Sequence, residues 1–385
     1  MIDYNAPKPT YSPKQWGQFI IPRIFFPPIL LWDLLKTGVN YLFGNIIAKK
    51  LVLPALSYFS SYSLTENSIN ELIKDKTYLK ASKFNVNTYD GGSLSTFEIQ
   101  HPSQTKHDIK DQQYIINFIG NSTCYELELS SIMRDVEELN VNVVSFNYRG
   151  VAQSTGSPKS IDDLLVDGIA QVQRLLENGV LPENITLKSH SLGGAVGTLV
   201  AHHFHQQGIT LNLFNSCSFS STTNEVVGMI RVGNTNTGHK ETVGYKVLGF
   251  LAKPFVKFCV SLVKWEINAG EAFKAIPEKY KEYILIRSAK NERNKSGIYD
   301  DSVIPHYASI HNFLKSERQA KKVAWKDAES THAKNRKMSA GASFDCHNVS
   351  RSKLKNRSGQ TANEFFNEFV RRKPEVHANT TAQLN

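Results

Sequence analysis

The sequence has few of the residues and patterns that mark several classes of protein. Among its 385 residues are only four cysteines, which stand far apart and form no C-x-x-C pair. Disulfide frameworks and cysteine-based zinc sites need more or closer cysteines, so we expect neither, and we expect a reducing compartment. The cysteines are Cys124, Cys217, Cys259 and Cys346.

Long hydrophobic runs are missing as well. No basic segment leads into an apolar core at the N-terminus, so we expect no signal peptide. Residues 19–59 are rich in Ile, Leu and Phe, but charges such as Arg23 and Asp33 and several prolines keep every run below the ~18–20 residues that a bilayer span needs. We therefore expect residues 1–80 to form an apolar, largely helical extension that lies on a membrane or packs against the main domain.

Acidic residues are scarce towards the C-terminus. Residues 315–373 hold 15 Lys or Arg and 6 Asp or Glu, and this excess of 15 − 6 = 9 nearly accounts for the formal net charge of +10. Such an excess favours an anionic partner, either lipid headgroups or nucleic acid. Because no nucleic-acid motif accompanies the charge, we expect an anionic membrane surface, and a solvated surface segment is the alternative.

What the sequence does contain is an alternation of short apolar strands and amphipathic helices. A hairpin is expected around residues 90–92, whose flanks alternate apolar and polar residues. Further strands are expected over 114–120, 141–150, 184–190, 211–217 and 282–290, and helices over 124–140, 160–179, 192–208 and 361–372. This alternation predicts an α/β fold with a mostly parallel sheet, helices on both faces, and ligands bound beyond the carboxyl ends of the strands.

Two insertions interrupt the alternation. Residues 219–281 read as mostly helical with exposed apolar positions, which suits a lid or cap over a site. Residues 315–337 form a basic insertion. We therefore divide the chain into the extension 1–80, a main domain over 81–372 and a tail over 373–385.

The stretch "KSHSLGG" stands between an expected strand and an expected helix, at residues 188–194. A nucleophile on a sharp strand-to-helix turn needs small residues two positions before and after it, which here are Ser189 and Gly193. The free N–H groups at the start of the helix would favour an oxyanion. Ser191 is therefore a candidate nucleophile, and the alternative is that it only caps the helix. His190 directly precedes Ser191 on the same turn, so we do not expect it to be the catalytic base.

A serine hydroxyl is a poor nucleophile unless a histidine, itself oriented by a carboxylate, takes its proton. Candidates for both partners follow downstream, with Asp300 and Asp301 in "YDDSVIP" and His347 in "FDCHN". His306 and His332 are rival histidines, but neither stands directly before the last expected helix.

Two further polar features have simpler interpretations. His202 and His205 are three apart on an expected helix, but no carboxylate or cysteine nearby completes a metal site. We expect no metal and no cofactor, and we interpret these histidines as an exposed helix end. Arg149 is interpreted as a structural anchor of its loop.

Four local patterns, taken together, resemble the α/β-hydrolase superfamily of serine hydrolases. They are "NYRGVAQSTGSP", "SHSLGG", "YDDSVIP" and "CHN", in this order between residues 84 and 372. The nearest likeness is to the membrane-associated lipid and acyl-ester hydrolases of the α/β-hydrolase-domain group. The resemblance implies an α/β-hydrolase fold and a catalytic triad of Ser191, His347 and Asp301, because the family's aspartate stands four positions before the proline.

The resemblance also implies an oxyanion hole. Its first donor would be the backbone N–H of Leu192, and its second that of Asn121, with Ser122 as the alternative. Two positions depart from the family's pattern, since Ser189 replaces a glycine and Ile119 replaces a histidine. The first substitution keeps a small residue, and a backbone donor tolerates the second.

The predicted function is a serine hydrolase that cleaves a carboxylic ester, resembling a lipase or phospholipase, at a membrane surface. The alternatives are an acyl-protein thioesterase, which would use the same triad, and a catalytically silent α/β-hydrolase scaffold. The predicted localisation is cytoplasmic or peripheral to a membrane. The composition and the lack of a signal peptide also fit a bacterial effector delivered into a host cell.

Overall fold

The computed structural model describes only part of the chain. It covers residues 3–7, 35, 38, 55–58, 63, 65–76, 78–232, 242–287, 301, 303–320, 337–339, 347, 348, 350–356 and 358–372. Most of the predicted extension over 1–80, most of the basic insertion over 315–337 and the tail over 373–385 lie outside these residues. The division into these segments therefore stays a prediction.

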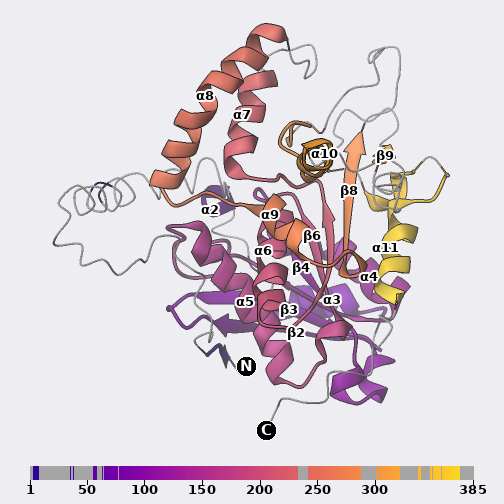
Figure 1. Cartoon of the computed structure of the whole chain (residues 1–385). Helices are drawn as coiled ribbons and strands as arrows, with labels where there is room; N and C mark the ends of the chain where they lie inside the picture. Colours follow the sequence, from indigo (N-terminus) through magenta and orange to yellow (C-terminus); the bar gives the residue numbers. More distant parts are fainter. Residues whose placement is uncertain are drawn as a thin grey trace.

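The described strands form one sheet in the order β1-β2-β3-β5-β4-β6-β7-β8-β9 (Figure 1). β3 runs antiparallel to β2 and β5, and the other neighbouring pairs run parallel. The strands are β1 (Tyr4–Asn5), β2 (Lys80–Asn87), β3 (Ser93–Gln100), β4 (Tyr114–Phe118), β5 (Asn142–Phe146), β6 (Ile185–His190), β7 (Asn212–Ser216), β8 (Lys281–Arg287) and β9 (Lys337–Ser339). The predicted hairpin and strands are confirmed, although the strand expected over 141–150 ends at Phe146.

The predicted helices are also confirmed, with one exception in detail. The helix expected over 124–140 begins as a short 3-10 turn, η5 (Tyr125–Leu127), before α4 starts. The described α-helices are α2 (Ala55–Tyr58), α3 (Glu66–Ile73), α4 (Leu129–Leu139), α5 (Ile161–Glu177), α6 (Leu192–Gln206), α7 (Thr222–Val232), α8 (Val243–Leu262), α9 (Ala269–Ala275), α10 (Ile310–Ala320) and α11 (Ala362–Arg371). A capping box at Thr361 and Glu364 fixes the start of α11.

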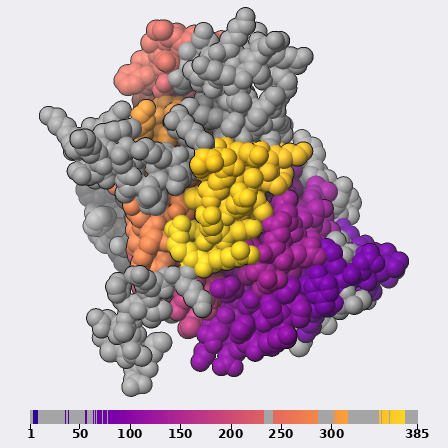
Figure 2. Space-filling view, turned by 90° about the vertical axis from the view of Figure 1, so that its right-hand side faces the viewer, coloured from indigo at the N-terminus to yellow at the C-terminus, as the bar shows by residue number. Residues whose placement is uncertain are grey.

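Side chains alternate across the sheet and fill two cores, one on each face. In β4, Ile116 and Phe118 pack in the core that α5 and α6 cover. Ile115, directly before Ile116, packs in the other core, against residues of α4 and α11. This alternation is the period-2 pattern of a strand buried on both faces. Figure 2 shows the C-terminal segment with α11, in yellow, seated against the magenta and purple surface of earlier elements.

The N-terminal residues contribute to the sheet in a way that the sequence analysis did not predict. β1 pairs in parallel with β2 at the sheet's edge, through Tyr4 opposite Val86. Further along the expected extension, the backbone N–H of Ala55 donates to the carbonyl of Asn121 at 3.1 Å. The described parts of the extension therefore pack on the main domain.

Arg149 lies buried in a cluster of carboxylates, as expected for a structural anchor of its loop. Its guanidinium donates to Asp167 on α5 at 2.7 Å and to Asp90 in the β2–β3 turn at 2.8 Å. Burial lowers the pKa of the Arg149 guanidinium, but the charges of Asp167 and Asp90 and their hydrogen bonds together outweigh burial and raise this pKa. The cluster fixes the loop after β5 to α5 and to the hairpin.

The interpretation of the α6 histidines as an exposed helix end was wrong. His203 is only 3% exposed, and His202 and His205 are half-buried. A ring nitrogen of His203 lies 2.8 Å from the side-chain amide of Gln207. Burial, with a smaller effect of neighbouring His202, lowers the pKa of His203 to about 4. The end of α6 is therefore packed rather than solvated.

The insertion expected over 219–281 is helical where the structure describes it. α7 and α8 pack side by side as a hairpin that projects from the main body (Figure 1). Gly249 lets them approach closely, because a Cβ there would lie 2.4 Å from the Arg231 side chain. Among the described residues, no helix is both long and apolar enough to cross a membrane. The function of the insertion as a lid stays a prediction.

Candidate functional site

Ser191 occupies a strained turn between a buried strand and a helix. β6 ends at His190, α6 begins at Leu192, and Ser191 between them has φ 56° and ψ −125°. L-residues other than glycine seldom adopt a positive φ, so this conformation costs about 1–3 kcal/mol. The backbone N–H of Ser191 donates to the carbonyl of Ser216 on β7 at 3.0 Å, which holds the turn against the next strand.

The small neighbours of Ser191 are required by the close approach of α6 to the sheet. A Cβ at Gly193 would lie 2.2 Å from the carbonyl oxygen of Phe118, which is closer than any side chain allows. A Cβ at Gly197, one turn later, would lie 2.2 Å from Oγ of Ser189. Ser189 is 1% exposed, so the position two residues before the nucleophile accepts a hydroxymethyl group but has no space for a larger one.

Asp301 and His347 lie together in a buried pair. Nδ1 of His347 is 2.7 Å from Oδ2 of Asp301, and the second carboxylate oxygen accepts the backbone N–H groups of Val303 and Ile304 at 2.9 Å. Burial alone would raise the pKa of Asp301. The hydrogen bond and charge of His347, with the two amides, outweigh burial and hold this pKa below its ordinary value. Asp301 is therefore an acceptor, and Nδ1 of His347 carries the proton.

His190 connects the turn to this pair. The centroids of its ring and the ring of His347 are 4.8 Å apart, and its Nδ1 lies 3.1 Å from Oγ of Ser216. Burial, with a smaller effect of the neighbouring His347, lowers the pKa of His190 to about 3. His190 is therefore neutral near pH 7 and packs against His347 without competing for its carboxylate.

Of the two expected oxyanion donors, Leu192 lies at this turn and Asn121 lies in the loop after β4. Leu192 is the first residue of α6, so its N–H has no acceptor within the helix. A Cβ at Gly120 would lie 4.0 Å from Oγ of Ser191, which places the backbone just before Asn121 beside the nucleophile. Ile119, at the position of the family's histidine, is buried in the core. Ser122, the alternative donor, is exposed.

A buried ion-pair network lies under the turn, and the sequence analysis did not predict it. Nζ of Lys188 on β6 donates to Asp135 of α4 at 2.7 Å, and Arg351 donates to the other oxygen of the same carboxylate. Burial would raise the pKa of Asp135, but the charges of Arg351 and Lys188 hold it below its ordinary value. Asp135 thereby links β6, the strand directly before Ser191, to Arg351, which follows His347 in the sequence.

Other candidate residues lie apart or outside the described part of the chain. His306 precedes α10, and its ring centroid is 6.0 Å from that of His311. Asp300 and His332 lie outside the described residues. Cys217 and Glu225, which the sequence analysis did not connect with the site, are buried close to Asp301. Their positions in the sequence did not connect these two residues with the site, because only the folded chain brings their segments close to Asp301.

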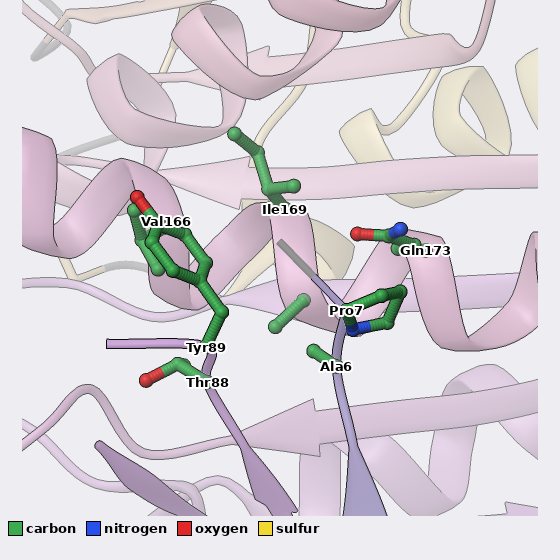
Figure 3. A pocket seen from close by; sticks show the side chains of 8 residues that line it. Ala6, Pro7, Thr88, Tyr89, Val166, Ile169 and Gln173 are labelled. Atoms are coloured by element: carbon green, nitrogen blue, oxygen red, sulfur yellow. The ribbon is translucent and has the colours of Figure 1, made fainter. Parts of the chain in front are cut away.

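A depression elsewhere on the molecule has no connection with this site. It is a hollow between β1, the β2–β3 turn and α5 that leaves no room even for a water molecule, with Pro7, Tyr89 and Ile169 among the lining residues (Figure 3). Ligand pockets usually measure about 300–1,000 Å³ and carry several polar groups. The depression is too small and too apolar to be a second ligand site.

The strand order, the single antiparallel strand β3 within the sheet and the strained serine after β6 together define the fold. The fold is that of an α/β-hydrolase. The fold class predicted from the sequence is thereby confirmed.

No family model and no curated protein matches the chain. Solved structures with a similar chain path include the esterase Pf2001 of Pyrococcus furiosus, at 16% identity over 68% of this chain and 82% of that one, with a TM-score of 0.42. An alpha-beta hydrolase from Vibrio vulnificus matches at 16% identity over 72% and 92%, with a TM-score of 0.44. An acetyl xylan esterase from Paenibacillus sp. R4 matches at 9% identity over 83% and 89%, with a TM-score of 0.43. The strand order and the strained turn at Ser191 identify the fold on their own.

Proposed function

We propose that the chain is a serine hydrolase that cleaves carboxylic esters with Ser191 as nucleophile, His347 as base and Asp301 as its orienting carboxylate. The observation that carries the proposal is the strained φ of 56° at Ser191, combined with the 2.7 Å hydrogen bond that orients His347 nearby. A strained residue persists only where the surrounding structure enforces it, and such residues cluster at functional sites.

The geometry supports a two-step reaction. Because Nδ1 of His347 donates to Asp301, Nε2 carries the lone pair that can take the proton of the Ser191 hydroxyl as it attacks the ester carbonyl. The leaving alcohol then takes that proton from His347, and an acyl-enzyme remains. Water attacks the acyl group after giving a proton to His347, and the acid and the free serine are released.

The N–H groups of Leu192 and Asn121 support the proposal as donors to the tetrahedral oxyanion. Each oxyanion donor contributes roughly 10²–10³ in rate in enzymes of this type. Both are backbone groups, so the departures at Ser189 and Ile119 leave this part of the mechanism available.

The test is hydrolysis of a soluble p-nitrophenyl ester by wild type and Ser191→Ala. We expect the rate to fall at least about 10⁴-fold in Ser191→Ala, because the nucleophile is lost. Ser189→Ala is the matched control, since it removes the other serine of the same motif, and it should keep most of the rate. Equal losses in both variants, or a folded wild type that hydrolyses nothing, would contradict the proposal and favour a silent scaffold.

The exposed surface of α8 supports a lipid-type ester as the substrate. Eight large apolar residues of this helix expose 38–78% of their surface: Val243, Tyr245, Val247, Leu248, Phe250, Leu251, Phe255 and Phe258. Most of them recur at helical spacing on one face, opposite the buried Gly249 and Val256. A soluble protein seldom exposes such a face unless it contacts a membrane or a partner.

The charges of α8 favour an anionic lipid surface as that partner. Its three charged residues are Lys246, Lys253 and Lys257, at a spacing that places them along one border of the apolar face. Lysine beside an exposed apolar face is typical of helices that lie in the headgroup region of a membrane. We therefore propose that the enzyme acts on acyl esters of membrane lipids.

Vesicle flotation with phosphatidylglycerol tests this part separately. Phe250→Glu with Phe255→Glu should weaken binding by at least roughly 100-fold, because each buried aromatic ring is worth about 1.5–3 kcal/mol. Ile109→Glu is the control, since Ile109 is 42% exposed and lies far from α8 in the sequence. Equal binding of both variants would contradict the docking of α8. Faster turnover of thioesters than of oxygen esters would instead favour the thioesterase alternative.

A further inference from the structure

Three side chains from distant segments, two of them members of the proposed triad, bring different metal-ligand atoms together. They are the thiol of Cys217, the carboxylate of Asp301 and the imidazole of His347, and their ligand atoms lie within 4.8 Å of one another. All three residues are buried, at 2%, 3% and 5% exposure. Cys217 directly follows β7 and has a φ of 51°, so the chain turns sharply at this residue.

The three donor types are those that zinc prefers. Zinc binds thiolate sulfur at about 2.3 Å and imidazole nitrogen or carboxylate oxygen at about 2.0 Å, usually in a tetrahedron. The ligand atoms of such a tetrahedron lie about 3.3–3.5 Å apart. Nδ1 of His347 and Oδ2 of Asp301 lie only 2.7 Å apart, so a metal between them would replace their hydrogen bond and widen this pair by about 0.6 Å. The thiol of Cys217 would move inward by about 1 Å, which side-chain rotation can supply.

Glu225 gives a second, independent indication of a cation site. This α7 residue is 8% exposed, and neither of its carboxylate oxygens has a hydrogen-bond partner among the described residues. Buried carboxyl groups are normally paired or bound to a metal, and a cation next to Asp301 would also stabilise ionised Glu225.

We propose that a soft divalent cation of the zinc type binds Cys217, Asp301 and His347 with Glu225 close by, and that the bound state is inactive. The inhibition rests on the proposed function, whereas the binding does not. Binding releases the proton of the Cys217 thiol. Because Asp301 lies at Nδ1 of His347, a metal that binds both takes Nδ1. The ring proton then moves to Nε2, and His347 cannot accept the serine proton.

Binding is measured first in Ser191→Ala, which isolates it from catalysis. Titration of this variant with Co²⁺ should give the thiolate-to-cobalt charge-transfer absorption, and calorimetry with Zn²⁺ should give one site. Adding Cys217→Ser should abolish the absorption and weaken Zn²⁺ at least roughly 100-fold, since even residues that only support a ligand contribute 10- to 100-fold. Cys259→Ser on α8 is the matched control and should change neither.

Glu225→Gln sharpens the assignment, because it keeps the shape of the side chain and removes the charge. We expect about tenfold weaker Zn²⁺ binding in this variant. Circular dichroism shows whether each variant is folded, and the Co²⁺ spectrum of the wild type needs no variant at all. Absence of the charge-transfer absorption in folded wild type, or equal Zn²⁺ affinity with and without Cys217, would overturn the proposal.

The inhibition is measured as the ratio of hydrolysis with and without Zn²⁺ for each variant. We expect Zn²⁺ to inhibit the wild type and Cys259→Ser alike, and Cys217→Ser to need at least roughly 100-fold more Zn²⁺. Cys217-dependent Zn²⁺ binding in a chain that hydrolyses no ester would support the metal site while overturning the proposed function. Inhibition that does not depend on Cys217 would overturn the inhibitory role of this site.

Discussion

The turn at Ser191 and the helix α8 differ most in the surroundings of their side chains. Around Ser191 the packing is so close that a single added carbon at Gly193 would lie 2.2 Å from a backbone oxygen. On α8, in contrast, Phe250 is 76% exposed and a Cβ at Gly244 would meet nothing within 4 Å. The difference shows that one region fixes a geometry, whereas the other presents a surface. Variants made in pairs, one in each region, test this division.

The largest expected effect is the loss of activity in Asp301→Asn. Asparagine would favour the wrong tautomer of His347, so kcat should fall by about 10⁴-fold. Asp300→Asn is the control, because the sequence offers this neighbour as the rival carboxylate. Steady-state kinetics on a soluble ester measures both, and a comparable loss in Asp300→Asn would refute the assignment of Asp301.

A paired glycine substitution tests the difference in packing directly. Gly193→Ala should lower the free energy of unfolding by about 3 kcal/mol, because the new Cβ overlaps the Phe118 carbonyl. Gly244→Ala on α8 should leave it unchanged or raise it by up to about 1 kcal/mol, since alanine favours a helix and the space is open. Urea unfolding measures both values. Similar effects of the two substitutions would remove the basis of the comparison.

Acid sensitivity should come from the packed region. Folded His203 has a pKa of about 4, below its ordinary value near 6.5, so from pH 6.5 to 4 the unfolded chain binds a proton that the folded chain does not. Stability therefore falls as the pH decreases through this range, by about 2 kcal/mol at pH 5 for this residue. Urea unfolding of His203→Gln at pH 7 and pH 5 should show a smaller loss than the wild type.

Lys257→Gln on α8 is the control for the acid series, because lysine does not titrate between pH 5 and 7. Its stability should fall with pH as much as that of the wild type. Parallel pH dependences of the wild type and His203→Gln would show that His203 is not the source of the sensitivity.

The smallest expected effect is at Ser189. Its buried hydroxyl has no hydrogen-bond partner among the described residues, so Ser189→Ala should raise the free energy of unfolding by about 1 kcal/mol. Exposed Ser261 at the end of α8 is the counterpart, and Ser261→Ala should stay within about 0.5 kcal/mol. Destabilisation by Ser189→Ala would show that the hydroxyl has a partner after all.

The sequence predicted what local periodicity and motif spacing determine. The strand–turn–helix around Ser191 could be found because an apolar run, two small residues and a glycine-containing helix follow one another. The β2–β3 hairpin followed from its glycine turn, and α11 from its amphipathic pattern. These features depend on residues that are near in the sequence.

Features that depend on distant segments could not be predicted. The strand β1 has two residues, too few for any periodicity, and exists because β2 offers it an open edge. Burial of His203 is set by how α6 packs, which the charge pattern of the helix does not reveal. Cys217 and Glu225 belong to no recognisable sequence motif. They reach the site only because the fold brings the end of β7, α7 and the loop at Asp301 close together.

The central claim is that Ser191 is the nucleophile, and covalent trapping tests it most directly. The wild type is treated with a fluorophosphonate, digested, and analysed by mass spectrometry for the modified peptide. We predict one adduct, on Ser191, and none after Ser191→Ala or after prior acid unfolding. An adduct on another residue, or none on the folded wild type, would contradict the account.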